Sequence, residues 1–264
     1  MKHSPSRVNL GPPPSENTPA PFIVAGPCSV ESFKQLDQVG QCLSECGVKW
    51  MRGGVYKLRT HPDSFQGLGQ SCFEWILEVK KKYKLHFITE ITDPRQIDEL
   101  LQVADALQVG TRNMFNYALL SELGKTNVPI ILKRAFSAKI KEFLLAAEYI
   151  TGEGNQDVWL CERGIRSFDT ETTRNTLDLG AIAWIKANTP WRILSDPSHG
   201  TGLSELVIPM AHASIAAGAD GLLVEIHPEP KKALSDSRQA LNFEQFKQLN
   251  KIVQQFPKFQ ENIL

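Results

Sequence analysis

Short runs of apolar residues alternate along this chain with longer stretches that carry apolar residues at helical spacing. Each apolar run is bounded by polar, glycine or proline residues and has the length of a strand that is buried on both faces. We expect strands at residues 21–26, 48–53, 85–90, 105–110, 128–133, 157–162, 191–196 and 220–225.

The stretches between these runs have the 3.6-residue period of amphipathic helices. We expect helices at residues 33–46, 72–83, 94–103, 116–123, 139–150, 170–187 and 203–217, and a last helix at 243–255. This alternation, over 264 residues, matches the size of a single (β/α)₈ TIM barrel. An open, doubly wound sheet is the alternative, but it requires fewer strands or an edge pair, and the pattern indicates neither.

The N-terminal segment has a different composition from the rest of the chain. Residues 1–20, MKHSPSRVNLGPPPSENTPA, are rich in Pro, Ser and Asn and contain little to bury. We expect a flexible lead-in at 1–20 and one catalytic barrel at 21–264. Neither this segment nor the short stretch after the last helix is long enough to fold alone, so we expect no separate regulatory domain.

Composition excludes several classes of partner. The formal net charge is zero, which argues against a nucleic-acid partner because such proteins usually carry a basic excess. No apolar run is long enough to span a membrane, and residues 1–20 lack the apolar core of a secretory signal. Five scattered cysteines also favour a reducing compartment, so we expect a cytoplasmic protein.

Polar side chains follow the predicted strands at their C-terminal ends, where the active sites of TIM barrels lie. In chain order these residues are Cys28, Arg52, Lys57, Glu90, Arg112, Lys133, Arg134, Arg163, His199 and Glu225. Because they follow every strand at the same end, we expect them to surround one site.

The cations of this set indicate an anionic ligand. Together with Arg59 and Arg166, the Lys and Arg residues at this rim would repel one another unless a multiply charged anion lay between them. Salt bridges within the rim are the alternative. The counter-charges Glu90, Glu162 and Asp196 are too few to pair with the whole set, so we expect a site for phosphate and carboxylate groups.

A second constellation has the chemistry of a metal site. Cys28, His199, Glu225 and Asp236 would supply a thiolate, an imidazole and two carboxylates, and the first and last strands are neighbours in a closed barrel. Mixed S, N and O donors favour one divalent Mn, Fe, Co or Zn ion over Mg²⁺. A fifth position on such an ion would accept water or a substrate oxygen.

Each member of this constellation also has an ordinary structural interpretation. Cys28 could be core filler, His199 a hydrogen-bond donor to a ligand, and Asp236 the N-cap of a helix. We expect His227 to be a substrate-side or structural histidine, not a metal ligand.

Several long motifs resemble a known family. They are GPCSVES (26–32), RGGVYKLRT (52–60), SFQGLG (64–69), TEITD (89–93), QVGTRNMFN (108–116), CERGIRSF (161–168), DPSHGTG (196–202) and VEIHPEPKKALSDS (224–237). The chain closely resembles the 3-deoxy-D-arabino-heptulosonate 7-phosphate (DAHP) synthases, and most of all the short type Iβ branch related to 3-deoxy-D-manno-octulosonate 8-phosphate synthases. The resemblance covers roughly residues 21 to 250.

The resemblance implies a transferase that joins phosphoenolpyruvate to D-erythrose 4-phosphate and releases phosphate, as the first step of the shikimate pathway. It implies that Cys28, His199, Glu225 and Asp236 bind the metal. The residues implied for the two substrates are Arg112, Lys133 and Arg163 at the phosphoenolpyruvate phosphate, Arg52 and Lys57 near its carboxylate and reacting carbons, and Arg59 and Thr60 at the aldose phosphate. Glu90 would orient the attacking water and Lys57 would carry a proton.

Residues 57–60 bear on the choice between the two related enzymes. The octulosonate enzymes carry Lys-Ala-Asn-Arg-Ser and the heptulosonate enzymes Lys-Pro-Arg-Thr, and the chain has Lys-Leu-Arg-Thr. The spacing favours erythrose 4-phosphate over the alternative, arabinose 5-phosphate. Leu58 departs from the proline and loosens the backbone there. Tyr56 and the segment Arg134–Phe136 are further departures from the family pattern.

A third interpretation is a barrel that binds metal and phosphate without turnover. The complete set of four ligands argues against it. Relatives form homodimers or homotetramers, so the resemblance implies a homo-oligomer.

Overall fold

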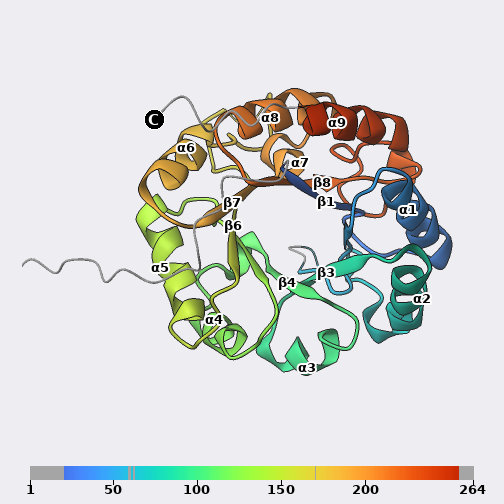
Figure 1. Ribbon diagram of the computed structural model, residues 1–264, viewed down its shortest axis with the longest axis horizontal. Coiled ribbons are helices and arrows are strands. Elements are labelled where there is room, and N and C mark those ends of the chain that lie inside the picture. The colour runs from blue at the N-terminus through green and yellow to red at the C-terminus, as the bar shows by residue number, and fades with distance from the viewer. Residues whose placement is uncertain (1–20, 59–60, 62, 170, 256–264) are drawn as a thin grey trace, which may run out of the picture.

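The computed structural model describes residues 21–58, 61, 63–169 and 171–255; the expected lead-in, residues 1–20, lies outside this part of the chain. The strands form a closed parallel barrel in the order β1-β2-β3-β4-β5-β6-β7-β8 (Figure 1). Their bounds are β1 Phe22–Gly26, β2 Trp50–Arg52, β3 His86–Ile91, β4 Ala106–Val109, β5 Ile130–Lys133, β6 Val158–Glu162, β7 Arg192–Ser195 and β8 Gly221–Glu225. The predicted TIM barrel is confirmed, and the open sheet is excluded.

Helices form a ring around this barrel (Figure 1). Their bounds are α1 Phe33–Glu45, α2 Phe73–Tyr83, α3 Ile97–Leu100, α4 Tyr117–Gly124, α5 Ile140–Thr151, α6 Leu179–Asn188, α7 Pro197–Thr201, α8 Ser204–Ala216 and α9 Phe243–Gln255. Short 3₁₀ turns lie at Gly69–Cys72, Pro94–Gln96, Thr111–Asn113 and Pro230–Lys232.

Two predicted helices were wrong in extent. The helix expected at 170–187 begins at Leu179, because the polar side chains before it bond the local backbone instead. Asp169 accepts hydrogen bonds from the backbone N–H groups of Glu171 and Thr172, and Asp178 caps α6. The helix expected at 94–103 shrinks to a 3₁₀ turn followed by α3, since a turn follows Leu100. The short helix α7 was not predicted.

The interior of the barrel is filled with side chains. Inward-facing residues from the strands form one buried cluster, which consists of Val24, Ile88, Ala106, Ile131, Trp159, Cys161, Leu194 and Leu223. Trp159 packs edge-on against Phe22 and Trp50, with ring centroids 5.1 and 5.6 Å apart. A second, larger core lies between the strands and the helices. Since the interior is packed, a ligand can enter the barrel from the C-terminal rim and not through its centre.

Barrel closure brings the first and last strands together, so that residues from early and late in the described chain meet at one point of the rim. Strands β1 and β8 pair in parallel, and Gly26 lies opposite Glu225. Cys28 follows β1 by two residues, so it lies beside the carboxylate that ends β8. The closure therefore places residues separated by about two hundred positions in the sequence next to each other, as Cys28 and Asp236 show.

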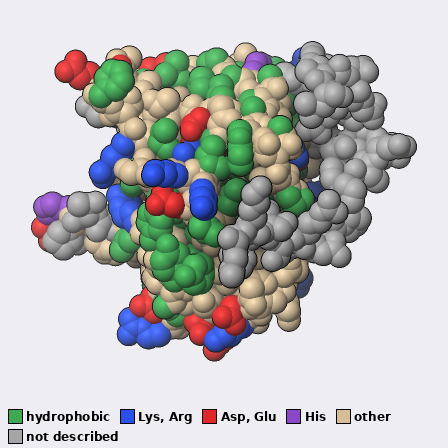
Figure 2. Space-filling view, turned by 90° about the vertical axis from the view of Figure 1, so that its left-hand side faces the viewer, with side chains coloured by type: hydrophobic (Ala, Val, Ile, Leu, Met, Phe, Trp, Pro, Cys, Tyr) green, Lys and Arg blue, Asp and Glu red, His purple; other side chains and the backbone are tan. Residues whose placement is uncertain are grey.

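The outer surface carries one apolar face. Figure 2 views the side of the molecule on which α5 and α6 lie, and hydrophobic side chains gather there between charged groups. Exposed large hydrophobic residues on these helices and on α4 are Tyr117, Leu145, Tyr149 and Trp184. None of the helices in the described part of the chain has the length and apolar character needed to cross a bilayer.

The fold makes α9 an integral part of the barrel. Phe246 of α9 is fully buried, and Asn250 donates a hydrogen bond to the carbonyl of Cys46 at the end of α1. We expect Phe246→Ala to lower the free energy of unfolding by about 3–5 kcal/mol, because truncation leaves a cavity. Gln254→Ala, at an exposed position of the same helix, should change it by less than about 0.5 kcal/mol. Urea denaturation followed by circular dichroism measures both, and equal losses would contradict this packing.

Candidate active site and metal centre

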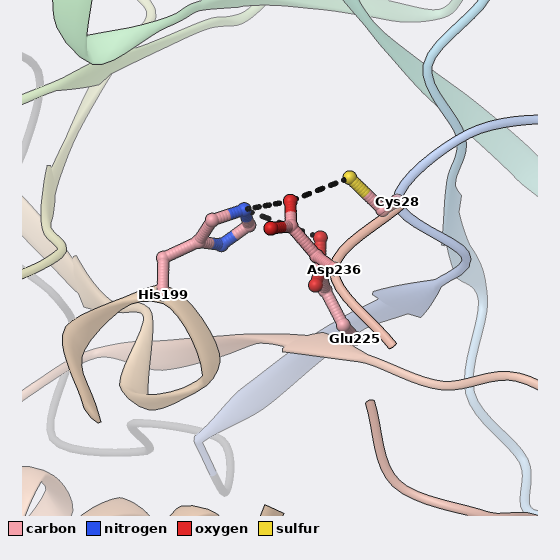
Figure 3. Close-up of side chains that lie close together, drawn as sticks. All are labelled: Cys28, His199, Glu225 and Asp236. Atoms are coloured by element: carbon pink, nitrogen blue, oxygen red, sulfur yellow. Dashed lines mark hydrogen bonds and ion pairs between the residues drawn. The ribbon is translucent and has the colours of Figure 1, made fainter. Parts of the chain in front are cut away.

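Four side chains with metal-binding atoms meet at the rim where β1 and β8 pair. They are Cys28, His199, Glu225 and Asp236, and their ligand atoms all lie within 4.8 Å of one another (Figure 3). Ligands about 2.0–2.3 Å from one ion lie about 3–4 Å from each other, so this spacing fits a shared ion. The structure brings the sequence-predicted quartet together.

His199 is oriented by Asp196. This aspartate caps the short helix α7 by accepting the backbone N–H of His199 at 2.9 Å, and it accepts Nδ1 of the same residue at 2.7 Å. A carboxylate can only accept, so Nδ1 carries the proton and Nε2 presents its lone pair to the cluster. Pro197 at the first position of α7 and Gly202 with a φ of 74° at its end define the length of the helix.

The groups that face one another in the cluster are acceptors. Nε2 of His199 lies 3.2 Å from Oε1 of Glu225 and 3.9 Å from Oδ2 of Asp236. Two acceptors at this distance repel unless a proton or a metal ion lies between them. Burial lowers the pKa of His199 below its ordinary value, which disfavours the extra proton. The donor set therefore fits a divalent cation.

Cys28 and Asp236 complete the cluster in complementary protonation states. Burial, followed by the negative charge of Glu225, raises the pKa of the Cys28 thiol to about 12, so the free group is a protonated thiol at neutral pH. Its S–H donates to Oδ2 of Asp236 at 3.1 Å. Burial alone would raise the pKa of Asp236, but His199 and Arg174 hold it well below its usual range. The aspartate is therefore an anion throughout the neutral range.

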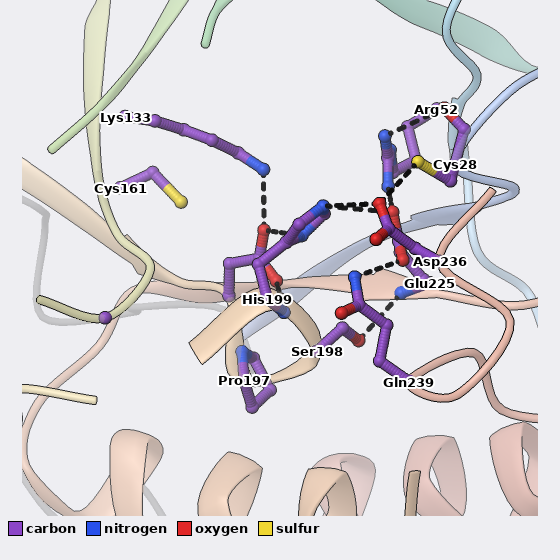
Figure 4. Close-up of polar contacts among 12 residues, drawn as sticks. Cys28, Arg52, Lys133, Cys161, Pro197, Ser198, His199, Glu225, Asp236 and Gln239 are labelled. Carbon is purple, nitrogen blue, oxygen red and sulfur yellow. Dashed lines mark hydrogen bonds and ion pairs between the residues drawn. The ribbon is translucent and has the colours of Figure 1, made fainter. Parts of the chain in front are cut away.

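The rim cations surround a cavity next to this cluster. Its lining includes the sequence-predicted residues Arg52, Lys57, Glu90, Arg112, Lys133, Arg163, His199 and Asp236, together with Arg174, which was not predicted. One predicted catalytic residue, Cys28, is not part of this lining, but its thiol contacts Asp236, which is (Figure 4). Arg59 and Thr60 lie outside the described residues, although Leu58 and His61 on either side of them line the cavity.

Salt bridges, the alternative interpretation of the rim cations, hold for four of them. Arg52 donates to Glu225 at 2.6 Å and Lys133 to Asp196 at 2.6 Å, both in buried contacts. Lys57 contacts Glu90 at 3.1 Å. The expected count left out the ligand carboxylate Glu225, which also serves as the partner of Arg52.

The fourth paired cation, Arg134, does not belong to the cavity. Its guanidinium is buried and donates to Glu162 and Asp178, each at 2.9 Å, and to the carbonyl of Ala138. It therefore joins β6 to the N-terminus of α6 as a structural residue.

Arg163 differs from the paired cations. It is buried and lines the cavity, and its Nη1 has no hydrogen-bond partner among the residues that the structure describes. The centroid of the Phe136 ring lies 4.8 Å from the guanidinium carbon of Arg163 and 5.6 Å from that of Arg166. The ring therefore stabilises both guanidinium groups by cation–π contact. A buried donor without a protein partner indicates a place for a ligand acceptor.

Glu90 and Lys57 lie side by side in the cavity. Burial alone would raise the pKa of Glu90, but Lys57 and Lys133 lower it, so the group is a carboxylate. Its Oε1 occupies the space that a side chain at Gly110 would fill, only 2.0 Å from the position of a Cβ there. Burial alone would lower the pKa of Lys57, but Cys28 and Glu90 raise it, so the group is an ammonium ion.

His227 is a structural residue, one of the two roles expected for it. Its Nδ1 accepts the backbone N–H of Glu229 at 3.0 Å, and its Nε2 faces Glu31 at 3.4 Å. Glu31 also accepts the backbone N–H of Leu234, so the pair ties the segment after β1 to the segment after β8.

Sequence reasoning missed three residues that contact the ligand quartet. Gln239 donates to Oε2 of Glu225 at 2.6 Å, and the hydroxyl oxygen of Ser198 accepts the backbone N–H of Glu225 at 3.0 Å. Arg174 donates to Oδ1 of Asp236 at 3.0 Å. Arg174 and Gln239 belong to irregular segments, one of which was predicted to be helical. The RNT sequence at 174–176 had no recognised motif, so no signal in a single sequence pointed to it.

Comparisons with known proteins agree with this geometry. The sequence model of the DAHP synthetase I family matches residues 17–261. The chain belongs to this family. It is 50% identical over 227 residues to "Phospho-2-dehydro-3-deoxyheptonate aldolase" of Thermotoga maritima, and the match covers 86% of this chain and 67% of the relative.

Solved structures and more distant relatives place the chain within the family. A crystal structure of the Thermotoga maritima DAHP synthase superposes with a TM-score of 0.86 at 49% identity, covering 89% of this chain and 68% of the other. A truncated form of that synthase has a TM-score of 0.82 at 46% identity, covering 89% and 86%. A "2-dehydro-3-deoxyphosphooctonate aldolase" of Nitrosococcus oceani is 29% identical, with 83% of each chain covered.

The buried ion pair of Lys133 and Asp196 yields a stability prediction. Asp196→Asn leaves the Lys133 ammonium without its counter-charge, and we expect a loss of about 3 kcal/mol in the free energy of unfolding. The matched control is Asp37→Asn, since Asp37 pairs with the exposed Lys82 and should cost less than about 1 kcal/mol. Urea denaturation of both variants without added metal is the measurement. A loss for Asp196→Asn no larger than that of the control would refute the assignment.

Proposed function

We propose that this chain is a DAHP synthase, which condenses phosphoenolpyruvate with D-erythrose 4-phosphate and releases phosphate at the start of the shikimate pathway. Membership of the DAHP synthetase I family and the 50% identity to a protein of that name support this activity. The observation that carries the proposal is the cavity in which a metal-binding quartet and a group of cations meet.

The quartet Cys28, His199, Glu225 and Asp236 would hold one divalent ion. Its mixed donors favour Mn, Fe, Co or Zn. When bound, the ion supplies Lewis acidity that polarises the aldehyde of the aldose for attack by the weakly nucleophilic enol. Asp196 keeps Nε2 of His199 available as a ligand atom, because it fixes the proton on Nδ1.

The cations would bind and orient phosphoenolpyruvate. Arg163 offers the buried Nη1 that no described residue pairs with, and together with Arg112 and Lys133 it would hold the phosphate. Arg52 and Lys57 lie nearer the quartet and would contact the carboxylate and the reacting carbons. These contacts would hold phosphoenolpyruvate in one orientation at the C-terminal rim, beside the quartet. Holding the substrate in this way would lower the entropic cost of the condensation.

Lys57 and Glu90 would manage protons and water. A bond forms between C3 of phosphoenolpyruvate and the aldehyde carbon, and water adds at C2. The resulting hemiketal loses phosphate by cleavage of its C–O bond. The Glu90 carboxylate can orient and deprotonate that water, and the Lys57 ammonium, 3.1 Å away, can supply a proton. The arginines neutralise the departing phosphate.

The metal requirement is tested by removing the ion and its ligands. We expect EDTA to abolish phosphate release and added Mn²⁺ to restore it. Cys28→Ala and His199→Ala should lose metal-supported activity while their circular dichroism matches that of the parent. Cys42→Ala is the matched control, because Cys42 is buried in α1 outside the site and should retain activity. Full activity after complete metal removal would overturn the metal's role.

The identity of the aldose is tested by comparing two substrates. We expect phosphate release with erythrose 4-phosphate to exceed that with arabinose 5-phosphate, and the reverse would favour the octulosonate synthase. Arg59→Ala should raise the KM for erythrose 4-phosphate far more than that for phosphoenolpyruvate, since Arg59 is proposed to bind the aldose phosphate. Equal increases in both KM values would contradict that assignment. A properly folded protein that turns over neither aldose would favour a barrel without catalysis.

We further propose that the protein acts in the cytoplasm as a homodimer or homotetramer. The exposed apolar residues on α4, α5 and α6 support an oligomer, since patches of this kind are typical of protein–protein interfaces. Light scattering coupled to gel filtration measures the mass in solution, and a monomer at micromolar concentration would contradict the proposal.

A further inference from the structure

Asp236 needs external support to keep its position in the quartet. It lies in an irregular segment between β8 and α9, and its φ of 52° is in the left-handed region that residues other than glycine seldom adopt. Neither strand nor helix fixes its side chain. The contacts that orient the carboxylate must therefore come from elsewhere in the chain.

Arg174 provides such a contact and extends it to a second ligand. Its Nη1 donates to Oδ1 of Asp236 at 3.0 Å and to Oε1 of Gln239 at 3.1 Å. The amide of Gln239 in turn donates to Oε2 of Glu225 at 2.6 Å (Figure 4). One guanidinium thus reaches both carboxylates of the quartet, directly in one case and through an amide in the other.

These donors bind the oxygens that do not face His199. Oδ2 of Asp236 is the atom nearest to Cys28 and His199, and Oε1 of Glu225 is the atom 3.2 Å from Nε2 of His199. Oε1 of Glu225 also accepts Nη1 of Arg52 at 2.6 Å, which leaves it a second lone pair. With Oδ1 and Oε2 bound by Arg174 and Gln239, the other oxygen of each carboxylate faces the place where an ion would lie. The network therefore selects one ligand oxygen per carboxylate.

The segment that carries Arg174 is anchored next to the third ligand. The backbone N–H of Arg174 donates to Thr201 at 2.9 Å, and Asn175 donates to the carbonyl of His199 at 3.0 Å. The side chain of Arg174 packs over Gly202, where a Cβ would lie 2.6 Å from it. The same two residues, Arg174 and Asn175, therefore support the helix of His199 and the loop of Asp236.

We propose that Arg174 is a positioning residue that sets the geometry of the metal-binding carboxylates, acting on Asp236 directly and on Glu225 through Gln239. This inference rests on the proposed metal site. It implies that the segment between β6 and α6 takes part in metal binding without supplying a ligand.

Electrostatics and positioning predict opposite effects of removing Arg174. A cation beside the quartet repels a divalent ion, so if charge were its whole effect, its loss would tighten metal binding. Positioning of ligands by neighbouring hydrogen bonds typically raises metal affinity by about 10- to 100-fold. The side chain of Arg174 is 40% exposed, so solvent screens its charge, and we expect the positioning effect to prevail.

The experiment measures Co²⁺ binding to the metal-free protein by chelator competition and by the thiolate-to-cobalt absorption band. Arg174→Gln is expected to bind Co²⁺ about 10- to 100-fold more weakly than the parent, with an altered band. Arg174→Lys keeps the charge on a shorter side chain and should recover part of the affinity. Gln239→Met should also weaken binding, and the double variant should lose less than the sum of the two single losses.

Arg238→Gln is the matched control, because Arg238 is an exposed arginine in the same loop, two residues after Asp236. The affinity of the Arg238→Gln variant for Co²⁺ should equal or exceed that of the parent. Circular dichroism of the metal-free variants establishes whether they fold. If Arg174→Gln does not fold, the Co²⁺ affinity of Arg174→Lys alone tests the inference. Parent-like affinity and spectrum in the folded Arg174 variants, or an equal loss in Arg238→Gln, would overturn the inference. A parent protein with no thiolate band would instead refute the metal site itself.

Discussion

The active-site rim is organised around a repulsion between hydrogen-bond acceptors. The lone pair of His199 Nε2 faces carboxylate oxygens of Glu225 and Asp236 within 3.9 Å, and burial disfavours a second proton on the imidazole. A divalent cation relieves this repulsion. Closure of the barrel makes the arrangement possible, since the pairing of β1 with β8 places Cys28 beside the same carboxylates.

The cations around the cavity have two different relations to this cluster. Arg52 and Lys133 neutralise buried carboxylates, and such pairs are stable before any substrate arrives. Arg163 instead keeps a buried donor that has no partner among the described residues, so in the proposed binding mode a phosphate would gain a bond there without breaking an ion pair. If Arg163 binds the substrate phosphate as proposed, selectivity for a multiply charged anion would come from a few cations and not from the total positive charge of the rim.

The sequence predicted the parts of the protein that depend on local pattern. Buried parallel strands read as short apolar runs, so every strand was located, and the rule that barrel sites lie at C-terminal strand ends brought Cys28, His199 and Glu225 to one rim. Ion pairing depends on which side chains meet in space, and for that reason the partners of Arg134 and Arg52 were missed. Arg174 was missed because local hydrogen bonds of Asp169 override the helical period of residues 171–178.

We propose that one divalent ion binds between Cys28, His199, Glu225 and Asp236. Anomalous X-ray scattering from crystals grown with Mn²⁺ tests it most directly, because the signal locates the ion without assumptions about the protein. We expect one strong peak at bonding distance from His199 Nε2, Cys28 Sγ and one oxygen of each carboxylate. A fully occupied peak elsewhere in the barrel, with these four side chains unbound, would contradict it.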